Sequence, residues 1–141
     1  MPVAVQIALG SALLIICATI HISVAMVTVA WLRAKQPLRH GLTYWSGFKT
    51  ISALFLFLLF SHTVQIYVWA FTFWASGALQ GYEAPIYFSL VTYTTLGYGD
   101  ITLTETFRIL GAMASVCGIL MFGLTTAFLV GVIARLLGTK P

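Results

Sequence analysis

Residues 94–100 read Thr-Thr-Leu-Gly-Tyr-Gly-Asp (TTLGYGD), and they interrupt a chain of 141 residues of which 60% are hydrophobic. Two threonines, two glycines, a tyrosine and an acid do not continue a membrane-spanning helix. Irregular backbone is tolerated at membrane depth only where protein buries it or where it lines a watery cavity. We therefore expect the chain on both sides of this stretch to build a membrane domain around it.

The composition indicates one membrane-embedded domain. Charged residues make up 7% of the chain, against about 25% in soluble domains. Three apolar stretches, residues 3–32, 51–75 and 107–137, are long enough to cross a bilayer, which takes about 20 residues as helix. The sequence thus predicts an all-α membrane protein with three transmembrane helices. Cys17 and Cys117 lie inside these apolar runs, and we expect them to be packing residues with no disulfide or metal role.

The charges predict how the chain is oriented. Basic residues stay on the cytoplasmic side of a membrane, and they occur between the first two spans and after the third: Arg33, Lys35, Arg39, Lys49, Arg135 and Lys140. We therefore expect a multi-pass protein of the cell (inner or plasma) membrane, with the N-terminus outside and the C-terminus in the cytoplasm. The three acids, Glu83, Asp100 and Glu105, lie in or beside the outer segment, where they attract cations. The basic residues are scattered, which argues against nucleic acid as a partner.

The segment before the quoted stretch predicts a short helix that enters the membrane without crossing it. Pro85 suits a first helical position, and residues 86–94 allow only about three turns. Beyond them, Gly97 and Gly99 permit positive φ without a steric penalty. Alternating these glycines with ordinary residues lets successive carbonyls point toward one axis, where they replace the water around a weakly hydrated cation. The hydroxyl of Thr95 adds a further oxygen, and the partly negative C-terminus of the short helix favours a cation below.

Residues 94–100 resemble the signature sequence of potassium channels, with Leu96 in the place of the familiar valine. The order of an outer helix, a pore helix, a filter and an inner helix is similar to the pore module of small prokaryotic pore-only channels. The resemblance implies a pore domain at 51–141, with the outer helix at 51–75, the pore helix and filter at 85–100 and the inner helix at 107–137. An extra N-terminal transmembrane helix (1–33) and a basic cytoplasmic loop (34–50) precede it.

The resemblance also implies a function and a set of site residues. It implies a homotetramer in membrane lipid that conducts K⁺, with no organic cofactor, soluble substrate or nucleic acid. The implied ion-binding residues are Thr95, Leu96, Gly97, Tyr98 and Gly99, with K⁺ at the first four. Thr94, Asp100 and Tyr87 are expected to support the filter. Relatives that carry a glutamate in the pore helix bond it to the acid after the filter. Val91 stands at that position here, so we expect the Tyr87 hydroxyl to hold Asp100 instead.

The inner helix carries two further expectations from the resemblance. Gly118 falls at the hinge position, with close helix packing as the alternative role. Below it, the resemblance places four cavity-lining residues on one side of the helix: Phe122, Thr126, Val130 and Ala134.

Polar residues within the first two spans form a separate candidate group. His21, His62 and Gln65 lie at bilayer depth, where polar side chains are costly and usually find partners. We expect them to form hydrogen bonds between helices, with proton sensing as the alternative role. The three residues form no recognisable metal-ligand set.

The functional alternatives are a weakly selective cation channel, a subunit that conducts only beside a different partner, and a non-conducting scaffold. The outer segment offers no nucleophile–base pair or metal-ligand set, so we do not expect an enzyme.

Overall fold

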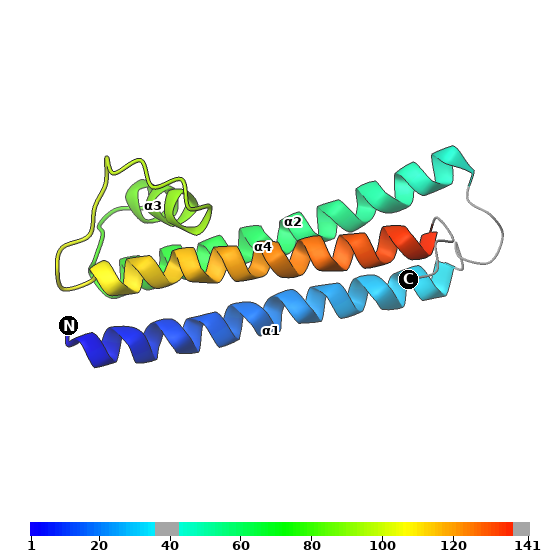
Figure 1. Cartoon of the computed structure of the whole chain (residues 1–141). Coiled ribbons are helices and arrows are strands. Elements are labelled where there is room, and N and C mark those ends of the chain that lie inside the picture. The colour runs from blue at the N-terminus through cyan, green and yellow to red at the C-terminus, as the bar shows by residue number, and fades with distance from the viewer. Residues whose placement is uncertain (36–42, 137–141) are drawn as a thin grey trace.

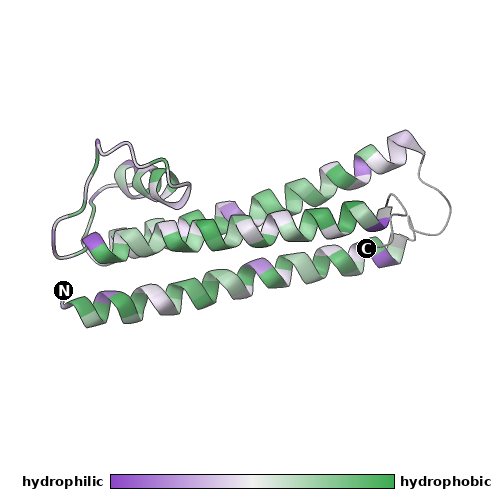
Figure 2. Cartoon of the chain, in the orientation of Figure 1, coloured by the Kyte–Doolittle hydropathy of each residue, from purple (hydrophilic) through white to green (hydrophobic). Residues whose placement is uncertain are grey.

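The computed structural model describes residues 1–35 and 43–136. Over these residues the chain forms four helices, α1 (Val3–Lys35), α2 (Tyr44–Ala75), α3 (Glu83–Tyr93) and α4 (Arg108–Leu136), and no strand (Figure 1). Three of them, α1, α2 and α4, are long and apolar enough to cross a membrane. Figure 2 shows hydrophobic positions along most of the length of these three helices. The prediction of an all-helical chain with three helices able to cross a membrane is confirmed for the described residues.

Two helix boundaries at the predicted inner loop differ from the prediction. α1 continues to Lys35 and α2 begins at Tyr44, so the loop predicted at 34–50 is shorter and the outer helix begins before residue 51. The physical reason is that hydropathy marks only the apolar part of a span, whereas lysine is a good helix former. Lys49 therefore lies within α2. The predicted basic residues Arg39 and Lys140 lie outside the described residues.

The pore-helix segment also begins earlier than predicted, at Glu83 rather than Pro85. Pro85 is the third residue of α3, where a backbone N–H has no partner within the helix. A proline in this first turn therefore costs no hydrogen bond. α4 begins at Arg108, one residue later than predicted, and its described part ends at Leu136.

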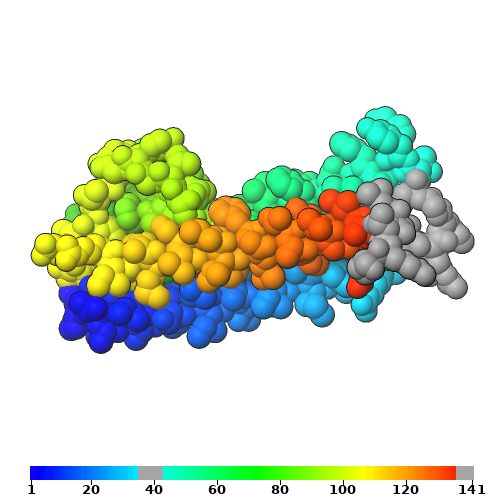
Figure 3. Space-filling model, in the orientation of Figure 1, coloured from blue at the N-terminus to red at the C-terminus, as the bar shows by residue number. Residues whose placement is uncertain are grey.

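The helices are arranged with α2 and α4 side by side, α1 along one side of this pair and α3 on the other (Figure 1). The N-terminus, α3 and the beginning of α4 share one end of the bundle. The extra helix α1 thus packs on α2 and α4 of its own chain. Figure 3 shows α1 lying along α4, and a hollow beside α4 between the α3 segment and the far end of α2.

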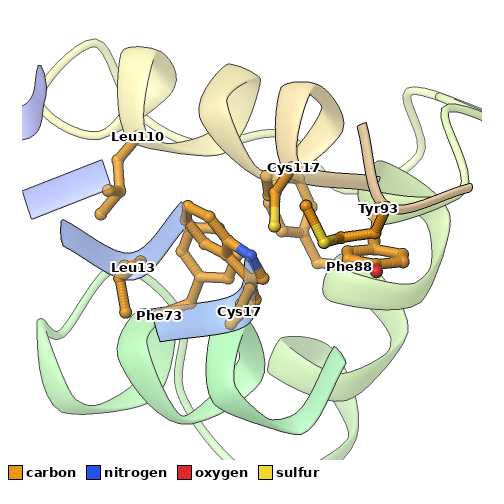
Figure 4. Packing of buried hydrophobic residues seen from close by; sticks show 10 residues of the cluster. Leu13, Cys17, Phe73, Phe88, Tyr93, Leu110 and Cys117 are labelled. Carbon is orange, nitrogen blue, oxygen red and sulfur yellow. The ribbon is translucent and has the colours of Figure 1, made fainter. Parts of the chain in front are cut away.

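The buried core lies at the α3 end of the bundle, where all four helices meet (Figure 4). Both cysteine thiols are free and buried there, consistent with packing roles. Lipid is as apolar as these side chains, so close packing and polar contacts hold the helices together rather than burial from water. The cluster consists of Leu13, Cys17, Trp69, Phe73, Phe88, Tyr93, Leu110, Ala114, Cys117 and Met121.

A buried amide joins α1 to the beginning of α4. The Gln6 side chain is 1% exposed, and its Oε1 accepts a hydrogen bond of 3.2 Å from the Leu110 backbone N–H. Leu110 is the third residue of α4, so this N–H has no acceptor within the helix. Gln6 also donates to the Met1 carbonyl at 3.1 Å. A residue of α1 therefore caps α4 near the predicted outer surface.

Candidate functional site

The candidate site begins where α3 stops at Tyr93. The backbone N–H groups of Leu96 and Gly97 both donate to the Val91 carbonyl, at 2.9 and 3.3 Å. The Thr94 hydroxyl donates to the Leu90 carbonyl at 2.7 Å. These bonds satisfy the last carbonyls of the helix and turn the chain into the loop 95–100.

Backbone conformation within this loop alternates. Thr95, Gly97 and Gly99 have positive φ angles of 62°, 58° and 78°, whereas Leu96 and Tyr98 between them do not. Positive φ at the two glycines is what the sequence predicts. At Thr95 it is unexpected, because a left-handed conformation costs an L-residue about 1–2 kcal/mol. Strain of this kind persists at functional sites, where the surrounding structure holds it in place.

The loop also leaves its peptide oxygens without partners in the chain. The carbonyl oxygens of residues 95–99 accept no hydrogen bond from the described residues. Every residue of 95–100 is exposed in the single chain, including Tyr98 at 69%. These carbonyl oxygens are thus open to water, a cation or further protein.

A short hydrogen bond fixes the far end of the loop. The Tyr87 hydroxyl donates to Asp100 Oδ2 at 2.6 Å, so the contact expected between these residues is present. The Ile101 backbone N–H donates to Asp100 Oδ1 at 3.0 Å. The Tyr87 hydrogen bond lowers the pKa of Asp100 and raises the pKa of Tyr87. The carboxylate therefore stays ionised while it joins the end of the loop to α3.

Gly118 lies where α4 touches the end of α3. A Cβ at this position would overlap the Tyr93 carbonyl oxygen and come within 2.8 Å of its carbonyl carbon. Nearby, the Ser115 hydroxyl donates to the Thr92 carbonyl at 2.9 Å. α4 runs as one helix through Gly118. The structure thus gives Gly118 the alternative, close-packing role, and the hinge role stays a prediction.

The four predicted cavity residues follow one another at intervals of four along α4, which places them on one side of the helix. Phe122 is 40% and Val130 62% exposed, Thr126 is exposed and Ala134 half-buried. The Phe122 ring also packs on His62 and Tyr93, with centroids 4.6 and 5.7 Å apart. The cavity-lining role of these four residues therefore stays a prediction.

The polar residues His21, His62 and Gln65 of the first two spans all have hydrogen-bond partners on other helices. His21 and Gln65 are fully buried and His62 is 7% exposed, and the Gln65 amide nitrogen lies 3.3 Å from His21 Nδ1. Sequence reasoning missed their other partners, Ser61, Tyr93 and Thr125. The helical spacing of Ser61 and Gln65 was the signal that could have found one of them. The described residues contain no group of three or more potential His, Cys, Asp or Glu metal ligands.

Comparison with known proteins identifies the family. Residues 53–135, more than half of the chain, match a family described as "Ion channel". No curated protein and no solved structure matches the chain.

Proposed function

The chain belongs to this ion channel family, and from that premise we propose that it is one subunit of a homotetrameric channel selective for K⁺. The observation that carries the proposal is the loop 95–99. It combines positive φ at every second residue with carbonyl oxygens that accept no hydrogen bond from the described residues. Rings of such carbonyls replace the hydration shell of K⁺ in potassium channels.

The exposure of the loop supports the tetramer. One chain supplies one side of an ion site, and Leu96 and Tyr98 are 54% and 69% exposed in it. In a tetramer the neighbouring subunits would cover these side chains and close the ring of oxygens. The ion-binding groups would be the backbone carbonyls of Thr95, Leu96, Gly97, Tyr98 and Gly99.

The same proposal gives a path for the ion. Ions would lose water near the ionised Asp100 and pass in single file along the carbonyls. They would regain water in a cavity lined by Phe122, Thr126, Val130 and Ala134. Several adjacent sites let one ion displace the next, so close coordination does not trap it. The N-terminus and Asp100 would face outside and Arg135 the cytoplasm, as basic residues are retained there.

A potassium flux assay on proteoliposomes tests this function. Gly97→Ala should abolish flux, because alanine disfavours the φ of +58° although an added Cβ approaches no atom closer than 4.0 Å. Gly77→Ala is the matched control: its φ is +73° and its Cβ would also meet open space, but it lies outside the loop. The proposal is wrong if the wild-type tetramer carries no K⁺, or if Gly97→Ala conducts as well as Gly77→Ala.

A further inference from the structure

Six polar side chains from all four helices form a closed ring of hydrogen bonds near the end of α3. Five of them are at most 7% exposed in the chain, and Thr125 is half-buried. In order around the ring, called here the polar ring, they are Ser61, His21, Thr125, His62, Tyr93 and Gln65, with successive distances of 3.1, 3.1, 2.8, 2.9 and 2.9 Å and a closing distance of 3.1 Å from Gln65 to Ser61.

The direction of these hydrogen bonds follows from the Gln65 amide. Its nitrogen lies 3.2 Å from the Ser61 backbone carbonyl, an acceptor that an amide oxygen would repel. The amide oxygen therefore faces Tyr93, whose hydroxyl donates to it. That hydroxyl has one proton, so it accepts from His62 Nδ1–H. A neutral histidine has one N–H and one acceptor nitrogen, so His62 Nε2 accepts from the Thr125 hydroxyl.

The remaining bonds continue in the same sense. Thr125 has donated its proton, so its oxygen accepts from His21 Nε2–H. His21 Nδ1 then accepts from the Ser61 hydroxyl, and the Ser61 oxygen accepts from Gln65. Each member of the polar ring thus donates once and accepts once around the circle. This requires both histidines to be neutral and in opposite tautomers, with the proton on Nε2 of His21 and on Nδ1 of His62.

A proton added to either histidine breaks this pattern. On His62 it would occupy Nε2 and point at the Thr125 hydroxyl, which donates to that nitrogen. On His21 it would occupy Nδ1 and face the Gln65 amide nitrogen, another donor, 3.3 Å away. The two imidazole rings are 5.1 Å apart, so a charge on one also opposes a charge on the other.

The surroundings offer a charged histidine no compensation. Apart from the histidines themselves, the titratable groups that interact electrostatically with Tyr93 are the thiols of Cys17 on α1 and Cys117 on α4, and Tyr67, further along α2, is exposed. All three carboxylates of the chain lie at residues 83–105, and none takes part in the polar ring. A buried charge without a partner is costly.

The polar ring holds the residue from which the candidate filter starts. Tyr93 is the last residue of α3, two positions before Thr95, and its hydroxyl makes both of its bonds within the ring. Through His21 and Thr125 the ring extends to α1 and α4. We propose that the polar ring positions the inner end of the filter, that α1 takes part in this through His21, and that a proton on either histidine opens the ring and lowers conduction. The effect on conduction rests on the proposed function; the ring itself does not.

The first test reads the ring without conduction. Histidine ¹⁵N NMR of the whole protein in lipid at pH 7.5, with the signals of His21, His40 and His62 assigned from single His→Gln variants, should show His21 protonated at Nε2 only and His62 at Nδ1 only. If His21 and His62 share one tautomer, or if either is charged, the polar ring is wrong. This result stands whether or not the protein conducts K⁺.

The second test compares K⁺ flux at pH 8 and pH 5. Thr125→Val keeps the side-chain shape and both histidines but removes the hydroxyl between them. It should lower flux at pH 8 by about two- to twelvefold, the factor for one net hydrogen bond, and flatten the decrease that we expect for wild type toward pH 5. Thr125→Ser restores the hydroxyl and should restore both flux and its pH dependence.

Thr63→Val is the matched control for this substitution. Thr63 is exposed on the same helix as His62, and its hydroxyl bonds only its own helix, at the Leu59 carbonyl. The K⁺ flux of Thr63→Val and its pH dependence should equal those of wild type. If Thr125→Val also equals wild type, the ring does not position the filter. If wild type itself carries no K⁺, the proposed function fails, and the NMR result alone decides whether the ring exists.

Discussion

Substituting Gly118 by alanine tests how α4 supports the end of α3. The new Cβ would lie 2.8 Å from the Tyr93 carbonyl carbon and 3.3 Å from its Cα, and would overlap the carbonyl oxygen. These are backbone atoms, so no side-chain rotation relieves the contact. Since ordinary contact begins at 3.4 Å, the two helices must separate by at least about 0.6 Å, an overpacking that typically costs about 1–3 kcal/mol.

A gain in helix propensity opposes this cost of overpacking, but the gain is smaller. Alanine is favoured over glycine inside a helix by about 0.8–1 kcal/mol, so the net result should be a less stable fold. Gly123→Ala is the control within α4, because its Cβ would meet no atom within 4 Å. It should be as stable as wild type or more so.

The assay is the free energy of unfolding in mixed detergent micelles, measured together with K⁺ flux. We expect Gly118→Ala to lose both stability and flux, because Tyr93 leads directly into the candidate filter. If Gly118→Ala is as stable as Gly123→Ala, the close contact is not formed. A changed open probability without a loss of stability would support the hinge role instead.

Three further predictions concern the end of the loop at Asp100 and the cap of α4 by Gln6. Tyr87→Phe removes the donor to Asp100, so current through the channel should inactivate faster than in wild type; equal inactivation rates would show that this bond does not hold the filter. Because that bond lowers the pKa of Asp100, the hydrogen bond is fully present above about pH 4, the ordinary range for aspartate. It is lost only as the pH falls through the lowered pKa. The difference between wild type and Tyr87→Phe should therefore be constant from pH 8 to 5, and a difference that shrinks over this range would contradict the assignment. Gln6→Ala leaves the buried Leu110 N–H without its acceptor and should cost about 1–3 kcal/mol of unfolding free energy, whereas Gln80→Ala, at an exposed position between α2 and α3, should cost little; equal values for the two would show that Gln6 does not cap α4.

The spans were predictable because crossing a bilayer depends on the length and hydropathy of one segment at a time. The beginning of α2 at Tyr44 was not predictable in this way, because the hydropathy of the sequence falls at Lys49 whereas its helix propensity stays high. Where α1 packs was predictable only in part. The hydrogen bond expected between the first two spans is present between His21 and Gln65, whereas the contact of α1 with α4 depends on how the helices pack.

The candidate site was predictable where local chemistry decides the conformation. Gly97 and Gly99 have the positive φ that glycine permits, and Tyr87 reaches Asp100. Positive φ at Thr95 was not predictable, because a β-branched residue disfavours it and only its surroundings hold it there. Tyr93 and Thr125 were missed as polar partners, since contacts between residues far apart in sequence depend on the packed helices.

The most direct test of the central claim is the reversal potential of the reconstituted protein with K⁺ on one side of a bilayer and Na⁺ on the other. If four copies of the loop 95–99 replace the water around K⁺, the reversal potential should follow the K⁺ gradient and the current should vanish when Na⁺ is the only cation. A reversal potential near zero, with Na⁺ carrying current as well as K⁺ does, would contradict it.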